Sequence, residues 1–147
     1  MFRSIVVGTD GSETAAKAVD AAIQLAALSG ATLELVCAYE PVSNQRLPQA
    51  SREVPAGKEW LVHRRAEVDA TLREGLERAA GAGVGARQHA REGDAADAIL
   101  DVAEELGADL IVVGNKGMTG AKRFVLGSVP NKVTHHAPCA VMIIRTS

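Results

Sequence analysis

Two spacings of apolar residues alternate along the chain. Short continuous apolar runs, the strongest being DLIVVG at 109–114, are typical of strands that are buried on both faces of a sheet. Between these runs, apolar residues recur every three or four positions, which predicts helices with one buried face. The expected strands are 2–8, 32–38, 84–90, 109–114 and 140–145, and the expected helices are 12–30, 59–80, 94–106 and 128–137.

Strand and helix alternate throughout, which predicts an α/β fold with a parallel sheet and right-handed crossovers that place helices on both faces. The length of 147 residues fits one domain, spanning 1–147. Ser12 and Gly30 are expected to cap the first helix, and Ser128 to be the N-cap of the last. Residues 84–90 form the weakest strand pattern, so we expect them at or near a sheet edge. The stretch 40–58 contains Pro41, Pro48 and Pro55 and is predicted to be an irregular loop.

In folds of this kind, ligands bind beyond the carboxyl ends of the strands, where the strand order reverses. Two loops in such positions carry candidate chemistry: Gly8-Thr9-Asp10-Gly11-Ser12 after the first strand, and Gly114-Asn115-Lys116-Gly117 after the fourth. Gly127-Ser128 follows the second loop nine residues later, at a predicted helix start. Glycines let backbone amides approach a ligand, and a helix N-terminus attracts phosphate. The spaced set therefore predicts an anion site.

Each of these features also has a structural explanation. The glycines are common in βα loops, and Ser128 can serve only as a cap. Asp10 can stabilise a turn, or it can accept a hydrogen bond from a ribose hydroxyl or hold a metal that bridges phosphates. Lys116, Lys122 and Arg123 are candidates to neutralise phosphate charge.

Charge and composition exclude several classes of protein. The net charge of −2 and the absence of a basic stripe disfavour nucleic acids and anionic membranes as partners. The opening apolar run is too short for a signal peptide or a membrane span, so a soluble, cytoplasmic protein is expected. Cys37 and Cys139 lie in apolar runs and are predicted to be buried, reduced thiols.

Motifs of several enzyme classes are missing from the sequence. It has no G-x-x-x-x-G-K-[ST], no G-x-G-x-x-G after its first strand and no G-x-S-x-G, which disfavours a P-loop, a dinucleotide site and a nucleophile elbow. His135 and His136 are adjacent, so they cannot share a helix face as metal ligands. No metal site, acid/base pair or phospho-accepting aspartate after the third strand is indicated, so no catalytic residue is predicted.

Three blocks of the chain together resemble the universal stress protein family, in its ATP-binding branch. They are IVVGTDGSETAAKAVDAA, ADLIVVGNKG and GSVPNKVTHHAPCAVMIIR, with the signature G-x2-G-x9-G-[ST] intact from Gly114 to Ser128. The resemblance implies a five-stranded parallel sheet in the order 3-2-1-4-5, of the Rossmann-like adenine nucleotide α-hydrolase-like type. It also implies a homodimer that pairs strands 140–145, and ATP, ADP or AMP as ligand, with Mg²⁺ or Mn²⁺.

Carried over by position, the resemblance assigns parts of a nucleotide to named residues. It implies that Asp10 meets the ribose or the phosphates and that the backbone of Cys37 and Ala38 contacts adenine. The ribose and phosphate set comprises Gly8, Thr9, Gly114, Asn115, Lys116, Gly117, Gly127, Ser128 and Val129. Gly8 replaces the usual Pro or Ala of relatives, and Asn115-Lys116 replaces Ser-Arg or Ser-His.

The sequence thus predicts a nucleotide-responsive binding protein with at most slow ATP hydrolysis. One alternative is an ATP-hydrolysing or nucleotidyl-transfer enzyme on the same fold. Another is a dimeric interaction module that does not use nucleotide. No downstream protein partner is indicated.

Overall fold

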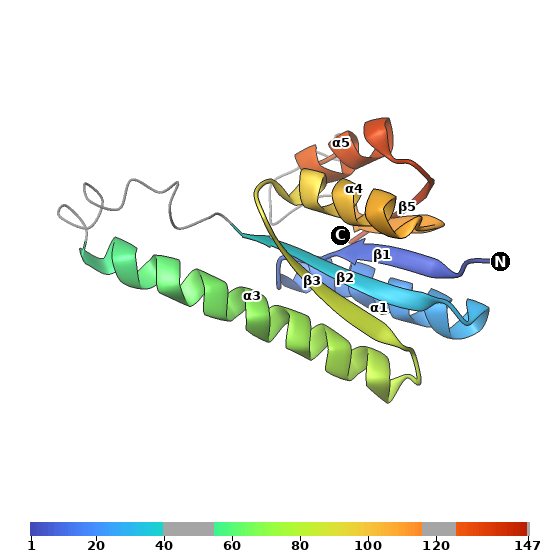
Figure 1. Cartoon of the computed structure of the whole chain (residues 1–147), viewed down its shortest axis with the longest axis horizontal. Helices are drawn as coiled ribbons and strands as arrows, with labels where there is room; N and C mark the ends of the chain where they lie inside the picture. The colour runs from blue at the N-terminus through green and yellow to red at the C-terminus, as the bar shows by residue number, and fades with distance from the viewer. Residues whose placement is uncertain (40–54, 116–125, 147) are drawn as a thin grey trace.

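Five parallel strands form one sheet in the order β3-β2-β1-β4-β5 (Figure 1), the order that the family resemblance implied. The computed structural model describes residues 1–39, 55–115 and 126–146. Its elements are β1 (Ser4–Gly8), α1 (Glu13–Ser29), β2 (Thr32–Tyr39), α3 (Pro55–Gly81), β3 (Ala86–Glu92), α4 (Ala95–Leu106), β4 (Leu110–Gly114), α5 (Ser128–His136) and β5 (Ala140–Ile144).

Two apolar cores hold the layers together, one on each face of the sheet. Helices α1 and α3 cover one face, and α4 and α5 cover the other (Figure 1). Successive side chains of a strand point to opposite faces, so Ile5 and Val7 of β1 pack under α1 while Val6 packs under α4. Burial on both sides explains why β1 and β4 consist of unbroken apolar runs.

The pairing of β1 with β4 joins residues that are far apart in the sequence. The register sets Ile5 opposite Leu110 and Val7 opposite Val112. At the start of the two strands, the Asp109 carboxylate accepts the backbone N–H groups of Arg3 and Ser4. These bonds, the one from Arg3 first, hold the pKa of Asp109 below its ordinary value because they stabilise the ionised form. Asp109 thereby helps to set the register.

The caps of α1 agree with the sequence prediction. The Ser12 hydroxyl oxygen accepts the N–H of Ala15 at 3.1 Å, and Gly30 ends the helix in the left-handed conformation (φ 75°). Within α1 the buried residues recur at three- and four-residue spacing: Ala18, Val19, Ala22, Ile23 and Ala26. No described helix is long and apolar enough to cross a membrane.

The predicted bounds of α3 and β3 were wrong by two to four residues. Helix α3 begins at Pro55, four residues before the expected start at Glu59, because proline fits the first turn of a helix, where its missing N–H is not needed. Strand β3 runs from Ala86 to Glu92 instead of 84–90. The Val84 N–H bonds back to Ala79 O at 2.9 Å, so Val84 belongs to the turn that ends α3. The rest of the predicted loop, 40–54, lies outside the described residues.

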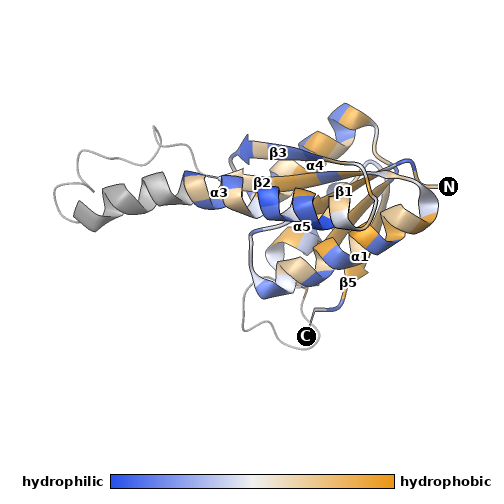
Figure 2. Ribbon diagram, turned by 90° about the horizontal axis from the view of Figure 1, so that it is seen from below, coloured by the Kyte–Doolittle hydropathy of each residue, from blue (hydrophilic) through white to orange (hydrophobic). Residues whose placement is uncertain are grey.

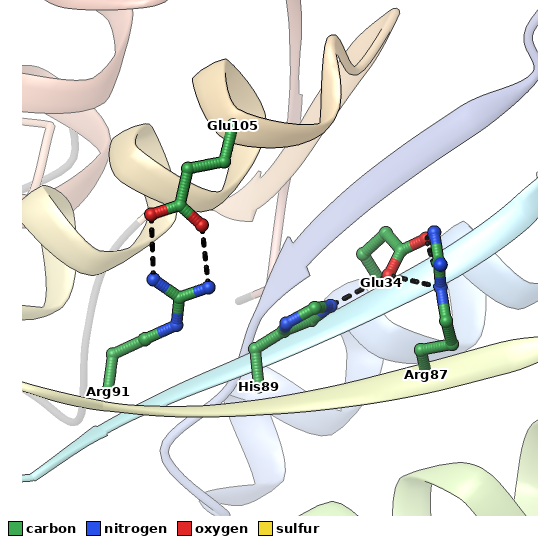
Figure 3. Close-up of polar contacts among 5 residues, drawn as sticks. All are labelled: Glu34, Arg87, His89, Arg91 and Glu105. Carbon is green, nitrogen blue, oxygen red and sulfur yellow. Dashed lines mark hydrogen bonds and ion pairs between the residues drawn. The ribbon is translucent and has the colours of Figure 1, made fainter.

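The two edges of the sheet differ in polarity. Strand β3 is largely hydrophilic (Figure 2), whereas β5 has the sequence AVMII. Beside β3, Glu34 of β2 is fully buried although it is a carboxylic acid. Its oxygens accept hydrogen bonds from Arg87 Nη2 at 2.6 Å and from His89 Nε2 at 2.7 Å (Figure 3). The polar edge strand therefore supplies the partners that a buried carboxylate requires.

A stability test follows from Glu34. The double variant Arg87→Met/His89→Leu leaves this buried carboxylate without donors, which generally costs about 3–5 kcal/mol. Adding Glu34→Leu removes the stranded charge, so the triple variant should be more stable than the double one. Urea denaturation of both proteins measures the difference, and a triple variant that is no more stable than the double would contradict this account of Glu34.

Candidate functional site

A pocket of about 140 Å³ opens at the carboxyl ends of β1, β2 and β4. Strands β1 and β4 are neighbours, but their following crossovers leave on opposite faces of the sheet, and this reversal creates a crevice between the loops. The N-terminal turns of α1, α4 and α5 border the crevice. The pocket is lined by Gly8, Thr9, Asp10, Ser12, Thr14, Ala15, Val36, Ala38, Ala95, Ile99, Val113, Gly114, Ser128, Val129 and Pro130.

The lining divides into an apolar part and a polar part. Val36, Ile99 and Val113 are buried hydrophobic residues of the sheet and of α4. Hydroxyl groups, the Asp10 carboxylate and helix N-termini make up the polar part. An apolar slot beside a few converging polar groups is the usual composition of a small-molecule site.

The loop between β1 and α1 is held by its own side chains. The Ser12 N–H donates to Asp10 Oδ1 at 2.9 Å, and the Gly11 N–H donates to Thr9 Oγ1 at 3.2 Å. Gly11 has a φ of 84°, and a Cβ there would lie 2.8 Å from Thr71 Oγ1 of α3. The turn uses only one Asp10 oxygen, while the side chain is exposed and lines the pocket.

At the start of α5 the structure corrects one prediction. Gly127, and not Ser128, is the N-cap, and Ser128 is the first helical residue. The Gly127 N–H bonds to Asn115 O at 3.0 Å, while Pro130 has no N–H to offer. The amides of Ser128 and Val129 are thus the donors that the first turn leaves without an intrahelical partner. Ser128 and Val129 both line the pocket.

Ion pairs join α5 to the N-terminus of α4. Lys132 Nζ lies 2.8 Å from Asp97 Oδ1 and 3.4 Å from Asp94 Oδ2. The hydrogen bond to Asp97 and then that to Asp94 raise the pKa of Lys132 above its ordinary value. Lys132 does not line the pocket, and Asp10 is the only charged side chain among the described residues that do.

The structure brings together seven of the residues that the sequence singled out. The residues that line the pocket are Gly8, Thr9, Asp10, Ala38, Gly114, Ser128 and Val129. The Cys37 side chain packs in the core under α1 and α3, on the other face of the sheet, and the Asn115 side chain bonds to Thr146. Lys116, Gly117, Lys122 and Arg123 lie outside the described residues.

Sequence reasoning missed the apolar part of the lining, of which Val36 and Ile99 are the clearest examples. Strand alternation gave a usable signal for Val36, because it lies two positions before Ala38 and therefore on the same face. Ile99 lies on the buried face of α4, but no sequence pattern shows that this face also borders a crevice. Both cysteines were predicted to be buried; Cys37 is buried, whereas Cys139 is only partly so.

The sequence matches the universal stress protein family over residues 1–145. The chain belongs to this family. The universal stress protein YxiE of Bacillus subtilis is 37% identical over 153 residues, covering 99% of this chain and 100% of that protein. The universal stress protein Rv1636 of Mycobacterium tuberculosis is 34% identical over 147 residues, covering 99% and 98%.

Solved structures of the family share the fold. A universal stress protein crystallised in complex with cAMP superimposes with a TM-score of 0.73 and 36% sequence identity, over 99% of this chain and 98% of that one. UspA of Lactobacillus plantarum superimposes with a TM-score of 0.79 and 26% identity, over 98% of each chain.

Packing at the pocket wall generates a second prediction. A Cβ added at Gly8 would lie 2.4 Å from Ile99 Cδ1, so Gly8→Ala should lower the free energy of unfolding by about 1–3 kcal/mol through overpacking. Ile99→Val removes that atom and alone should cost about 0.5–1.5 kcal/mol. The double variant should therefore lose less than the sum of the two, as measured by urea denaturation; strictly additive losses would show that this contact does not limit position 8.

Proposed function

We propose that this universal stress protein binds an adenine nucleotide, with ATP as the leading ligand, and acts as a nucleotide-responsive regulatory protein. The observation that carries the proposal is the convergence of an apolar slot, the Asp10 carboxylate and the N-terminus of α5 in one pocket. The three parts of an adenine nucleotide follow the same order of polarity: an apolar adenine, a ribose with hydroxyl groups and charged phosphates.

Each part of the pocket suits one part of such a ligand. The surface formed by Val36, Ala38 and Ile99 offers apolar contact to a purine, and strand backbone groups offer hydrogen bonds to its edge. The second oxygen of Asp10 can accept from ribose hydroxyls. The amides of Ser128 and Val129 and the positive end of the α5 dipole favour phosphate oxygens.

Two further observations support this ligand class. The signature from Gly114 to Ser128 is intact, and a relative of 36% identity was crystallised with cAMP. Mg²⁺ or Mn²⁺ fits the site as a companion of ATP, because such ions are commonly held by one carboxylate, here Asp10, together with substrate phosphates. Since Asp10 has no second acid or base beside it among the described lining residues, we expect at most slow hydrolysis.

We further propose that the protein forms a homodimer through β5. Within the described part of the chain, this strand pairs only with β4, at the end of the sheet order. Met142 and Ile143 are 38% and 41% exposed, so both faces of the edge carry apolar surface. A two-fold axis beside β5 would pair two copies of the strand and cover that surface.

The binding proposal is tested by isothermal titration calorimetry with ATP and Mg²⁺, and with AMP and cAMP in parallel. Asp10→Asn keeps the acceptor for the Ser12 N–H but removes the charge, so affinity should fall roughly tenfold or more, the worth of a hydrogen bond to a charged group. The matched control is Asp101→Asn, the same change at an exposed position of α4 that does not line the pocket.

Unchanged affinity in Asp10→Asn would remove Asp10 from the site. Absence of heat with all three nucleotides, for protein freed of endogenous nucleotide, would overturn the proposed function. Binding of cAMP or AMP in preference to ATP would keep the adenine nucleotide and replace the leading ligand.

The dimer proposal is tested by sedimentation velocity. Ile143→Lys places a charge on the β5 edge and should weaken self-association roughly tenfold or more. Leu28→Lys is the control, because Leu28 is an 86% exposed apolar residue on α1 away from the edge. Equal sedimentation of wild type and Ile143→Lys would rule out β5 as the interface.

A further inference from the structure

Two elements that line the pocket, α1 and the end of β4, meet a second time outside it, at Thr146, which follows β5. The Asn115 side-chain oxygen accepts both the N–H and the hydroxyl of Thr146, each at 2.9 Å. Lys17 of α1 donates its ammonium group to the Thr146 carbonyl oxygen at 3.0 Å. We call these three residues, Asn115, Thr146 and Lys17, the clasp.

The backbone of Asn115 extends the clasp to two more segments. Its carbonyl oxygen accepts the Gly127 N–H at 3.0 Å, and its N–H donates to Ile144 O at 2.9 Å. Asn115 therefore touches the end of β5, the residue that caps α5 and, through Thr146, helix α1. It also follows Gly114, which lines the pocket.

The burial of Thr146 makes the loss of any of these contacts costly. Thr146 is only 2% exposed and is one of two buried polar residues, with Glu34, in the described part of the chain. Its N–H, hydroxyl and carbonyl groups all have partners in the clasp. Loss of one partner would leave a buried polar group unsatisfied, a larger penalty than loss of an exposed hydrogen bond.

We propose that the clasp positions the nucleotide pocket from outside, and that Asn115 acts as a positioning residue whose side chain holds Thr146 instead of contacting the ligand. The pocket-lining residues adjoin the clasp directly: Gly114 precedes Asn115, Ser128 follows Gly127, and Thr14 lies one turn before Lys17. The clasp thus sets the distance between the β4 end, the α5 N-terminus and α1. This inference rests on the proposed nucleotide function, although its structural part can be tested without nucleotide.

The informative variant is Thr146→Val, because Thr146 does not line the pocket and valine keeps the backbone N–H while losing the hydroxyl. Thr146→Ser restores a hydroxyl and should recover wild-type behaviour. The matched control is Ser29→Ala, which removes another hydroxyl-to-carbonyl bond, from Ser29 to Leu25 O at 2.8 Å, at the opposite end of α1.

Two measurements are made on each protein. The Kd for ATP with Mg²⁺, or for cAMP where that binds better, should rise roughly three- to tenfold in Thr146→Val, the effect of about one hydrogen bond. Amide hydrogen exchange at Gly127 and Asn131, whose N–H groups bond to Asn115 O and Gly127 O, should become roughly threefold faster or more in the nucleotide-free form of the same variant. Thr146→Ser and Ser29→Ala should match wild type in both measurements.

The outcomes separate the two proposals. Wild-type Kd and wild-type exchange in Thr146→Val would overturn the clasp, whatever ligand the pocket takes. Faster exchange with an unchanged Kd would overturn its role in binding and leave Thr146 as a purely structural anchor. Faster exchange in a protein whose wild type binds no nucleotide would support the clasp as the element that positions α5 while the proposed function fails.

Discussion

The parallel pairing of β1 with β4 is the contact on which the rest of the structure depends. It joins Val7 to Val112 across more than a hundred residues of sequence, and Asp109 fixes where the pairing begins. Because parallel strands end at the same edge of a sheet, this register brings Gly8 and Gly114 to one pocket. A shift of one residue would turn every side chain of a strand to the other face and destroy both cores.

The two edge strands of the sheet differ in the charge and polarity of their side chains. Strand β3 carries Arg87 and His89, whose donors satisfy the buried Glu34, and Arg91 pairs with Glu105 of α4 (Figure 3). Such charges protect an edge from pairing with another chain. Strand β5 has no comparable charge in its sequence AVMII, which is why we propose self-association through that edge.

Stability and ligand recognition share parts around the pocket. Ile99 is 3% exposed, yet it both fills the core under α4 and forms the pocket wall. The Thr9 hydroxyl and the Asp10 carboxylate hold their own turn by hydrogen bonds in the ligand-free structure. The polar end of the pocket is therefore organised in advance, which lowers the entropy cost of ordering it when a ligand binds. The clasp extends this organisation to α5, whose N-terminus carries no side-chain cap.

Local patterns in the sequence determined the order and type of the elements, the caps of α1 and the loops that carry the chemistry. Apolar periodicity and capping depend on neighbours within a few residues. The glycines of the Gly114–Ser128 signature can likewise be read from one continuous stretch of the sequence. Local patterns were less reliable at element boundaries. Pro55 begins α3, and Val84 belongs to the turn after that helix. The N-cap of α5 is Gly127 and not Ser128.

Tertiary structure alone decided what each residue faces. Nothing local to Asn115 shows that its side chain bonds to Thr146, and nothing local to Glu34 predicts a buried acid held by β3. The same is true of Ile99, whose place in the pocket wall depends on how α4 crosses the sheet. These contacts join segments distant in the sequence, and their partners are set by strand register and helix packing, which no short window of residues contains.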